Sequence, residues 1–181
     1  MTTTTPRIYV ASLSDYNAGR LHGKWIDAAQ DVDTIREEIS EMLAGSKELG
    51  AEEWAIHDFE GFGEWRLSES ESLETITIYA AALAELVDEA GEAFPVWYGN
   101  ASRAAYTDPD ELLNDFNDAY RGKWSSLADY AADCAEQCGN IPKDLPDFIR
   151  NNIDWEGVAA DLEGVWTHRT TGGDVFVFED Q

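Results

Sequence analysis

Positive charge is what this chain has least of. Its 181 residues hold 12 Lys and Arg against 37 Asp and Glu, so the formal net charge is −25. Proteins that bind nucleic acid set Lys and Arg against the phosphates, so nucleic acid is excluded as a direct partner. The surplus is −7 over residues 1–60, −6 over 61–107 and −12 over 108–181. It is therefore not an acidic tail, although an acid-coated enzyme of the halophile type stays open.

Cysteines and long apolar runs are also scarce. Cys134 and Cys138 lie four residues apart on one predicted helix, without a nearby histidine. Two cysteines so placed are poorly aimed for a disulfide and are a weak metal signal, so we expect reduced thiols. No segment approaches eighteen apolar residues, and the opening MTTTTPR has no apolar signal core. We expect a cytoplasmic protein with no membrane partner.

Catalytic motifs are missing as well. The chain has no GxSxG, Walker or dinucleotide-binding glycine pattern. Its carboxylates lie spread along amphipathic helices, whereas a metal-dependent nuclease needs a few acids that converge in a cleft. We therefore expect no catalytic residue, no metal and no cofactor. The alternative enzyme is an acidic metal-dependent hydrolase that uses Asp115, Asp118 and Asp129.

Apolar and aromatic residues, at 44% and 12%, are abundant enough for a folded core despite the charge. The pattern predicts an elongated α+β protein of three modules with small antiparallel sheets. These modules are an N-terminal ββαβ module at 1–62, a central helical module at 63–106 and a C-terminal α+β module at 107–181. Alternation predicts strands at 7–13, 21–27 and 53–59, and a terminal hairpin of 164–169 with 174–179. Helical spacing predicts helices at 31–43, 72–90 (ended by Gly91), 94–105, 146–150 and 155–162.

The stretch 108–139 carries the densest combination of acids and aromatics. Asp108 followed by Pro109 is typical of a helix start. Leu112, Phe116 and Tyr120 then form one apolar face, and Gly122 is expected to end the helix. Ser126 with Asp129 is a capping-box pattern that starts a second helix containing Tyr130, with Trp124 in the turn between them. The sequence therefore predicts a helical hairpin with a packed seam and an acidic exterior.

The run LLNDFNDAYRGKWSSLADYAADCAE at 112–136 resembles the antirestriction motif of the ArdA family. Residues 7–27, 52–62 and 151–164 are similar to other signature stretches of that family, in the same order. The matching motif core consists of Phe116, Tyr120, Gly122, Trp124 and Tyr130. Added acidity between Asp144 and Glu163 departs from the family pattern and is expected to bear on target range.

The resemblance implies a homodimeric antirestriction protein made by mobile genetic elements. It would be an acidic DNA mimic that occupies the DNA-binding groove of type I restriction–modification enzymes, on their methyltransferase core, without catalysing a reaction. Carboxylates expected to contact that partner are Asp108, Asp110, Glu111, Asp115, Asp118, Asp129, Asp133, Glu136, Asp144, Asp147, Asp154 and Glu156. An acidic adaptor that masks a DNA-binding regulator is the remaining alternative.

Overall fold

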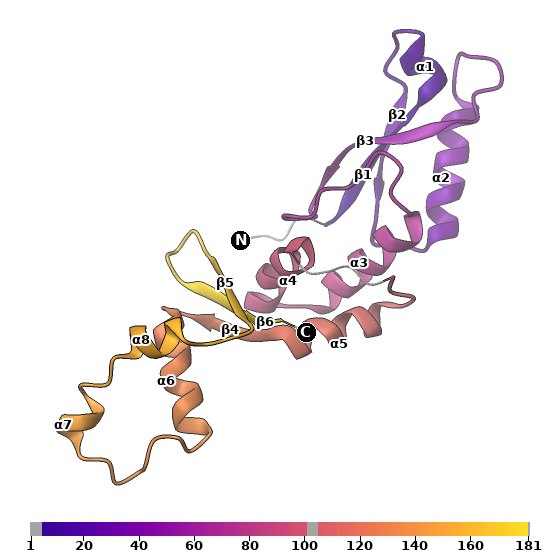
Figure 1. The fold of residues 1–181 in the computed structure, drawn as a ribbon. Helices are drawn as coiled ribbons and strands as arrows, with labels where there is room; N and C mark the ends of the chain where they lie inside the picture. The colour runs from indigo at the N-terminus through magenta and orange to yellow at the C-terminus, as the bar shows by residue number, and fades with distance from the viewer. Residues whose placement is uncertain (1–4, 101–104, 181) are drawn as a thin grey trace. The chain divides into compact units, whose positions relative to one another are not determined.

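The computed structural model describes residues 5–100 and 105–180, which form helices and two small antiparallel sheets (Figure 1). This confirms the α+β class predicted from the sequence. The chain folds as two compact units, residues 1–116 and 117–181. The finer division into three modules stays a prediction. Over the described ranges, no helix is long and apolar enough to cross a membrane.

The first unit begins with a three-stranded sheet of order β2-β1-β3, all antiparallel. Its strands are β1 (Arg7–Ser12), β2 (Gly23–Asp27) and β3 (Trp54–Glu60), with the short helix α1 (Leu13–Asn17) after β1. Helix α2 (Val32–Ala44) contacts β1 and β2 and buries Ile35, Ile39 and Met42. Asp31 is the N-cap of α2, at the start of the helix expected over 31–43, because its side chain accepts from the Thr34 amide at 2.9 Å. The predicted ββαβ order is confirmed, with α1 as an unexpected addition.

Two further helices of the first unit enclose an aromatic core. They are α3 (Leu73–Glu85) and α4 (Asp88–Asn100). The Tyr79 ring of α3 is fully buried, and its centroid lies 5.2 Å from Phe94 and 4.9 Å from Tyr98, both on α4. Phe62 and Trp65, from the segment after β3, complete the cluster around Tyr79. Rings from α3, α4 and the segment after β3 therefore form one buried aromatic cluster.

The prediction of a single helix over 72–90 is wrong. The backbone is extended at Leu86 and left-handed at Asp88 (φ 52°), so α3 ends and α4 starts in a new direction. Gly91, expected as a cap, is buried inside α4. The break lets Phe94 reach the same core as Tyr79, which a continuous helix could not do. The predicted end of the next helix at 105 follows residues 101–104, which lie outside the described ranges.

The predicted helical hairpin is also wrong. Helix α5 (Pro109–Ala119) is followed by a strand, β4 (Tyr120–Trp124), and only then by α6 (Leu127–Gln137). Tyr120 therefore lies on a strand and not on a helix face. Gly122 is left-handed (φ 99°), as predicted, but it lies where the pairing of β4 shifts register and not at a helix end. The strand forms because Tyr120 pairs with Phe178 and Trp124 with Val175, more than fifty residues away.

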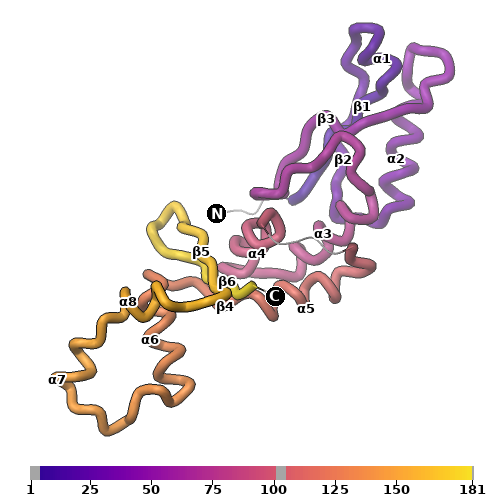
Figure 2. Tube along the Cα trace, viewed as in Figure 1, coloured from indigo at the N-terminus to yellow at the C-terminus, as the bar shows by residue number. Residues whose placement is uncertain are grey.

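The second unit contains a sheet of order β4-β6-β5, from β5 (Val165–Arg169) and β6 (Val175–Glu179). The central strand β6 is buried from Val175 to Phe178, so both of its faces are covered. Helices α6 and α8 (Trp155–Ala160) pack together through Ala128, Ala131 and Ala159. Figure 2 shows the long connection between them, which carries the single-turn helix α7 (Asp147–Arg150). The terminal hairpin and both short helices agree with the predictions.

Candidate functional site

Much of the chain's positive charge is neutralised by its own acids. The ion pairs of the described residues include Arg7–Glu60, Arg20 with Asp15 and Glu48, Lys24–Glu38, Arg36 with Asp33 and Glu74, Arg121–Glu179, Lys123–Asp174 and Arg150–Glu136. Several of these pairs join segments far apart in the sequence. Since acids outnumber bases by three to one, the pairs leave a large surplus of carboxylates on the surface. The outward electrostatic field is therefore strongly negative.

A hollow of about 790 Å³ on the first unit gathers several of these carboxylates. Helix α3 contributes Ala81 and Glu85, and the other described residues of the lining are 107–111 and 113–115, around the start of α5. Among the described residues of this lining there is no Lys or Arg. The carboxylates in it are Glu85, Asp108, Asp110, Glu111 and Asp115. Four of the twelve sequence-predicted acids are thus brought together in one place.

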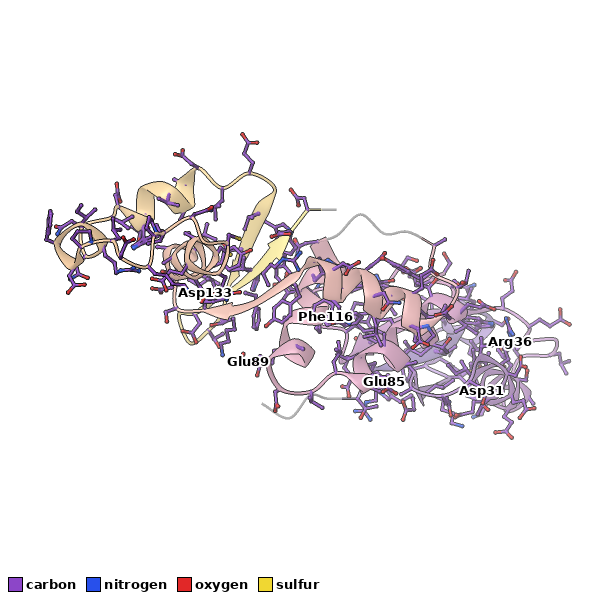
Figure 3. All side chains as sticks on the ribbon, turned by 90° about the horizontal axis from the view of Figure 1, so that it is seen from below. Asp31, Arg36, Glu85, Glu89, Phe116 and Asp133 are labelled. Carbon is purple, nitrogen blue, oxygen red and sulfur yellow. The ribbon has the colours of Figure 1, made fainter. Side chains whose placement is uncertain are left out.

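A second hollow, of about 470 Å³, shares Ala81, Glu85 and Pro109 with the first. Its lining extends along α3 to Ile78 and reaches Asp31 at the start of α2. Asp31 and Glu85 are labelled in Figure 3. Glu85 has no sequence neighbour among the predicted acids, and Asp31 was expected only as the first residue of a helix. The sequence therefore gave no signal that either one borders an acidic groove.

Local hydrogen bonds fix most of the carboxylates at the first hollow. Asp108 accepts from the Glu111 amide at 2.9 Å, which makes it the N-cap predicted for α5. Glu111 in turn accepts from the Thr107 amide at 3.1 Å. The Tyr106 hydroxyl donates to Asp115 at 2.9 Å, and burial followed by this bond raises the pKa of Tyr106 above its ordinary value. These acids are held at defined positions on a helix end.

In the second unit, α6 presents two of the predicted acids. Ser126 is its N-cap, accepting from the Asp129 amide at 3.2 Å and donating its hydroxyl to the Asp129 carboxylate at 2.8 Å. The carboxylate of this capping pair therefore binds the serine hydroxyl, where a full capping box would use the serine amide. Asp133 (labelled in Figure 3) accepts from Gln137 one turn later. Asp129 is exposed and Asp133 is half-buried.

Apart from Asp118 near the end of α5, the remaining predicted acids lie between the last turn of α6 and the first turn of α8. Glu136 binds Arg150 at 2.7 Å, and Asp154 caps α8 by accepting from the Gly157 amide at 3.0 Å. All of the loop carboxylates are exposed. Within the described part of the chain, the carboxylates of five predicted acids have neither a hydrogen bond nor an ion pair: Asp110, Asp118, Asp144, Asp147 and Glu156. These five are free to meet a partner without breaking a hydrogen bond or an ion pair.

The motif-core residues have structural roles in the described chain. Phe116 (labelled in Figure 3) is fully buried, with its ring edge-on to Phe94 at 5.3 Å and to Trp97 at 5.5 Å. The half-buried Tyr120 ring lies 5.6 Å from Phe178. These contacts place both residues in packed cores, so they act on function through folding.

Trp124 and Tyr130 lie together on one face of the second sheet. Their ring centroids are 5.6 Å apart, and the Trp124 indole donates to the Arg121 carbonyl at 2.8 Å. Tyr130 donates its hydroxyl to Glu179 at 3.1 Å. The Glu179 carboxylate also accepts a hydrogen bond from the Arg121 guanidinium. This bond first, and then the one from Tyr130, hold the pKa of Glu179 below its ordinary value. Trp124, which we expected in a turn between two helices, thus packs against the sheet of its own unit.

Over residues 5–100 and 105–180, no group of three or more His, Cys, Asp or Glu side chains is placed to hold a metal ion. The carboxylates considered for a hydrolase are divided between the two units, with Asp115 in the first and both Asp118 and Asp129 in the second. Cys134 is half-buried, Cys138 is exposed, and both are free thiols, as the sequence predicted.

Comparison with known proteins decides the family. The family model described as "Antirestriction protein (ArdA)" matches residues 8–176. The chain belongs to the ArdA family. A search of curated proteins finds no match. The ArdA match runs from β1 to β6 and so includes both compact units. As a member of the ArdA family, this chain is an antirestriction protein, and restriction–modification enzymes are the partners that the family suggests.

Proposed function

We propose that this ArdA-family chain blocks type I restriction–modification enzymes by imitating duplex DNA. In this proposal, Asp and Glu side chains take the places of phosphates in the DNA-binding groove of the methyltransferase core. The observation that carries the proposal is the division of charge. Ion pairs with the chain's own acids neutralise much of its positive charge, while exposed carboxylates such as Asp110 and Asp147 have no internal partner.

The amount of charge suits a mimic. Duplex DNA carries one negative charge per ~1.7 Å of axis, so a net charge of −25 corresponds to roughly 40 Å of duplex. A homodimer would carry −50 and correspond to roughly 85 Å. Restriction enzymes hold tens of base pairs, so a dimer would cover a groove of that length. We therefore propose that the chain acts as a homodimer. We also propose that it acts in the cytoplasm, where the target enzyme works on DNA.

The carboxylates are also presented in a suitable way. Asp108, Glu111 and Asp115 are fixed by hydrogen bonds around one hollow, so they lose little freedom on meeting a basic groove. Each Lys or Arg of the target that would have met a phosphate can meet one of these acids, with counterions released from both partners. Binding would need no base sequence, and no step in it would require a cofactor.

The proposal can be tested with charge-neutralising variants that leave the fold intact. Asp110→Asn, Asp144→Asn, Asp147→Asn and Glu156→Gln each remove a charge that makes no internal hydrogen bond or ion pair. Three of these acids lie in the first turn of a helix, so each substitution should change stability by no more than about 1 kcal/mol. Each variant would be titrated against a type I methyltransferase in competition with labelled duplex, over a series of salt concentrations. Each single variant should lose about fivefold in affinity at most, because one exposed ion pair contributes little.

The quadruple variant should lose roughly the sum of the four effects, because distant sites act independently. Log affinity of the wild type should also fall linearly with log salt, as it does for DNA itself. The proposal fails if affinity is indifferent to salt. It also fails if a single variant abolishes inhibition while the others change nothing, since that result would mean a discrete catalytic or binding site.

A further inference from the structure

Helix α7 presents an exposed aromatic side chain to solvent. Phe148 is 73% exposed and its neighbour Ile149 is 43% exposed, on the single turn within the connection from α6 to α8. Other large rings of the second unit, such as Tyr130 and Phe178, are buried. Aromatic side chains concentrate binding energy at protein interfaces, so an exposed one next to a second apolar residue marks a candidate contact.

The position of Phe148 is fixed by contacts within the same loop. The Arg150 guanidinium donates to the Glu136 carboxylate at 2.7 Å and to the Pro142 carbonyl at 3.1 Å, which ties α7 to the end of α6. The Asn152 side chain donates to the Phe148 carbonyl at 2.8 Å. Arg150 is therefore turned toward its own chain while the Phe148 ring is left in solvent. The Phe148 ring is therefore exposed on a helical turn whose position is fixed by these hydrogen bonds.

The charge around this ring decides what can cover it. Asp144 and Asp147 are exposed within four residues of Phe148 in the chain, and the exposed Lys143 comes directly before Asp144. The one base of α7, Arg150, is bound to Glu136, so acids predominate in this segment. A second copy of the chain would bring the same acids against these acids, and the repulsion would oppose contact. A surface with an apolar hollow bordered by Lys or Arg is complementary to the segment in both shape and charge.

We propose that α7 is an apolar anchor for the target enzyme, with Phe148 and Ile149 inserted between basic residues of its DNA-binding surface. This inference rests on the proposed function and adds a component that DNA itself does not have. An apolar contact releases no counterions, so it contributes to affinity equally at low and high salt. The carboxylates contribute the part that salt weakens.

The test compares Phe148→Ala with Leu49→Ala. Leu49 is fully exposed in the first unit, between Glu48 and Glu52, so both substitutions remove an exposed apolar group from acidic surroundings. Each variant would compete with labelled duplex for a purified type I methyltransferase across a salt series. We expect Phe148→Ala to weaken binding about tenfold or more at every salt concentration, giving a line parallel to that of the wild type. Leu49→Ala should stay within about twofold of wild type.

Asp147→Asn is the opposite control, because loss of a charge should reduce the slope against salt and change affinity little when salt is high. The anchor is overturned if Phe148→Ala behaves as Leu49→Ala does, or if its loss of affinity disappears at high salt. It is also overturned if light scattering shows that Phe148→Ala dissociates a dimer, since a second copy would then cover the ring. Failure of the wild type to displace the duplex would overturn the proposed function together with the anchor.

Discussion

The substitution Phe116→Ala tests whether packing against the aromatic core of the first unit holds α5, the helix that carries several of the exposed acids. The Phe116 side chain is fully buried at the end of this unit, and its ring packs edge-on against Phe94 and Trp97 of α4. It is also part of the same helix, α5, that carries Asp110 and Glu111. Loss of the ring should therefore weaken the attachment of α5 to the aromatic core.

The expected magnitude follows from burial. Removing a fully buried phenylalanine side chain forfeits its transfer free energy and leaves a cavity, which together cost about 3–5 kcal/mol. The two edge-to-face contacts place Phe116→Ala at the upper part of that range, since such pairs contribute about 0.5–1.5 kcal/mol beyond their area. With a urea dependence of roughly 1–3 kcal/mol per molar, the unfolding midpoint should fall by at least about 1 M.

The assay is urea unfolding followed by far-UV circular dichroism, with Phe148→Ala as the matched control. Both variants make the same chemical change, but Phe148 is 73% exposed, so its loss should alter stability by no more than about 0.5 kcal/mol. Inhibition by Phe116→Ala should fall in proportion to the unfolded fraction. An unfolding midpoint of Phe116→Ala that matches wild type, or equal losses in both variants, would refute the packing described for α5.

Two further predictions concern stability. The buried Asp15 carboxylate accepts from Ser46, Ser12 and Arg20, and these bonds, that from Ser46 first, lower its pKa despite burial. Because the folded pKa is lowered, its stabilisation is present above the ordinary value of 3.8 and is lost as pH falls through the folded pKa. Asp15→Asn should therefore unfold in less urea than wild type at neutral pH, and the difference should shrink as pH falls through the lowered pKa of Asp15; a difference that is constant with pH would contradict this. Ser126→Ala removes the N-cap of α6 and should cost about 1 kcal/mol in the same assay, and an unchanged midpoint would show that the cap is dispensable.

Sequence reasoning succeeded where a structure depends on residues close along the chain. The N-caps Asp31, Asp108 and Ser126 were predictable because each side chain bonds an amide only three residues away. The terminal hairpin was predictable for the same reason, since only a short turn separates β5 from β6. The surplus of acids and the scarcity of bases, which carry the proposed function, are also properties of composition alone.

The candidate site was only partly predictable. Residues 108–115 lie on one turn-and-helix segment, so their acids could be grouped from the sequence. Glu85 could not be added to them, because it borders the hollow only through the packing of α3 in the first unit. The outward position of Phe148 depends likewise on the bond from Arg150 to Glu136, fourteen residues away.

Tertiary structure decided what Tyr120 to Trp124 become. Tyr120 continues the helical apolar pattern of Leu112 and Phe116, and Gly122 follows two residues later. This is why the sequence predicts a helix that ends at a glycine cap. The backbone amides and carbonyls of this segment instead bond β6, and the Tyr120 ring packs on Phe178. Local periodicity cannot reveal pairing with a strand so distant in the chain. This pairing provides hydrogen-bond partners for the backbone of the segment and at the same time packs the Tyr120 ring. Long-range pairing of this kind overrides a local helical preference because that preference is worth only a few tenths of a kcal/mol per residue.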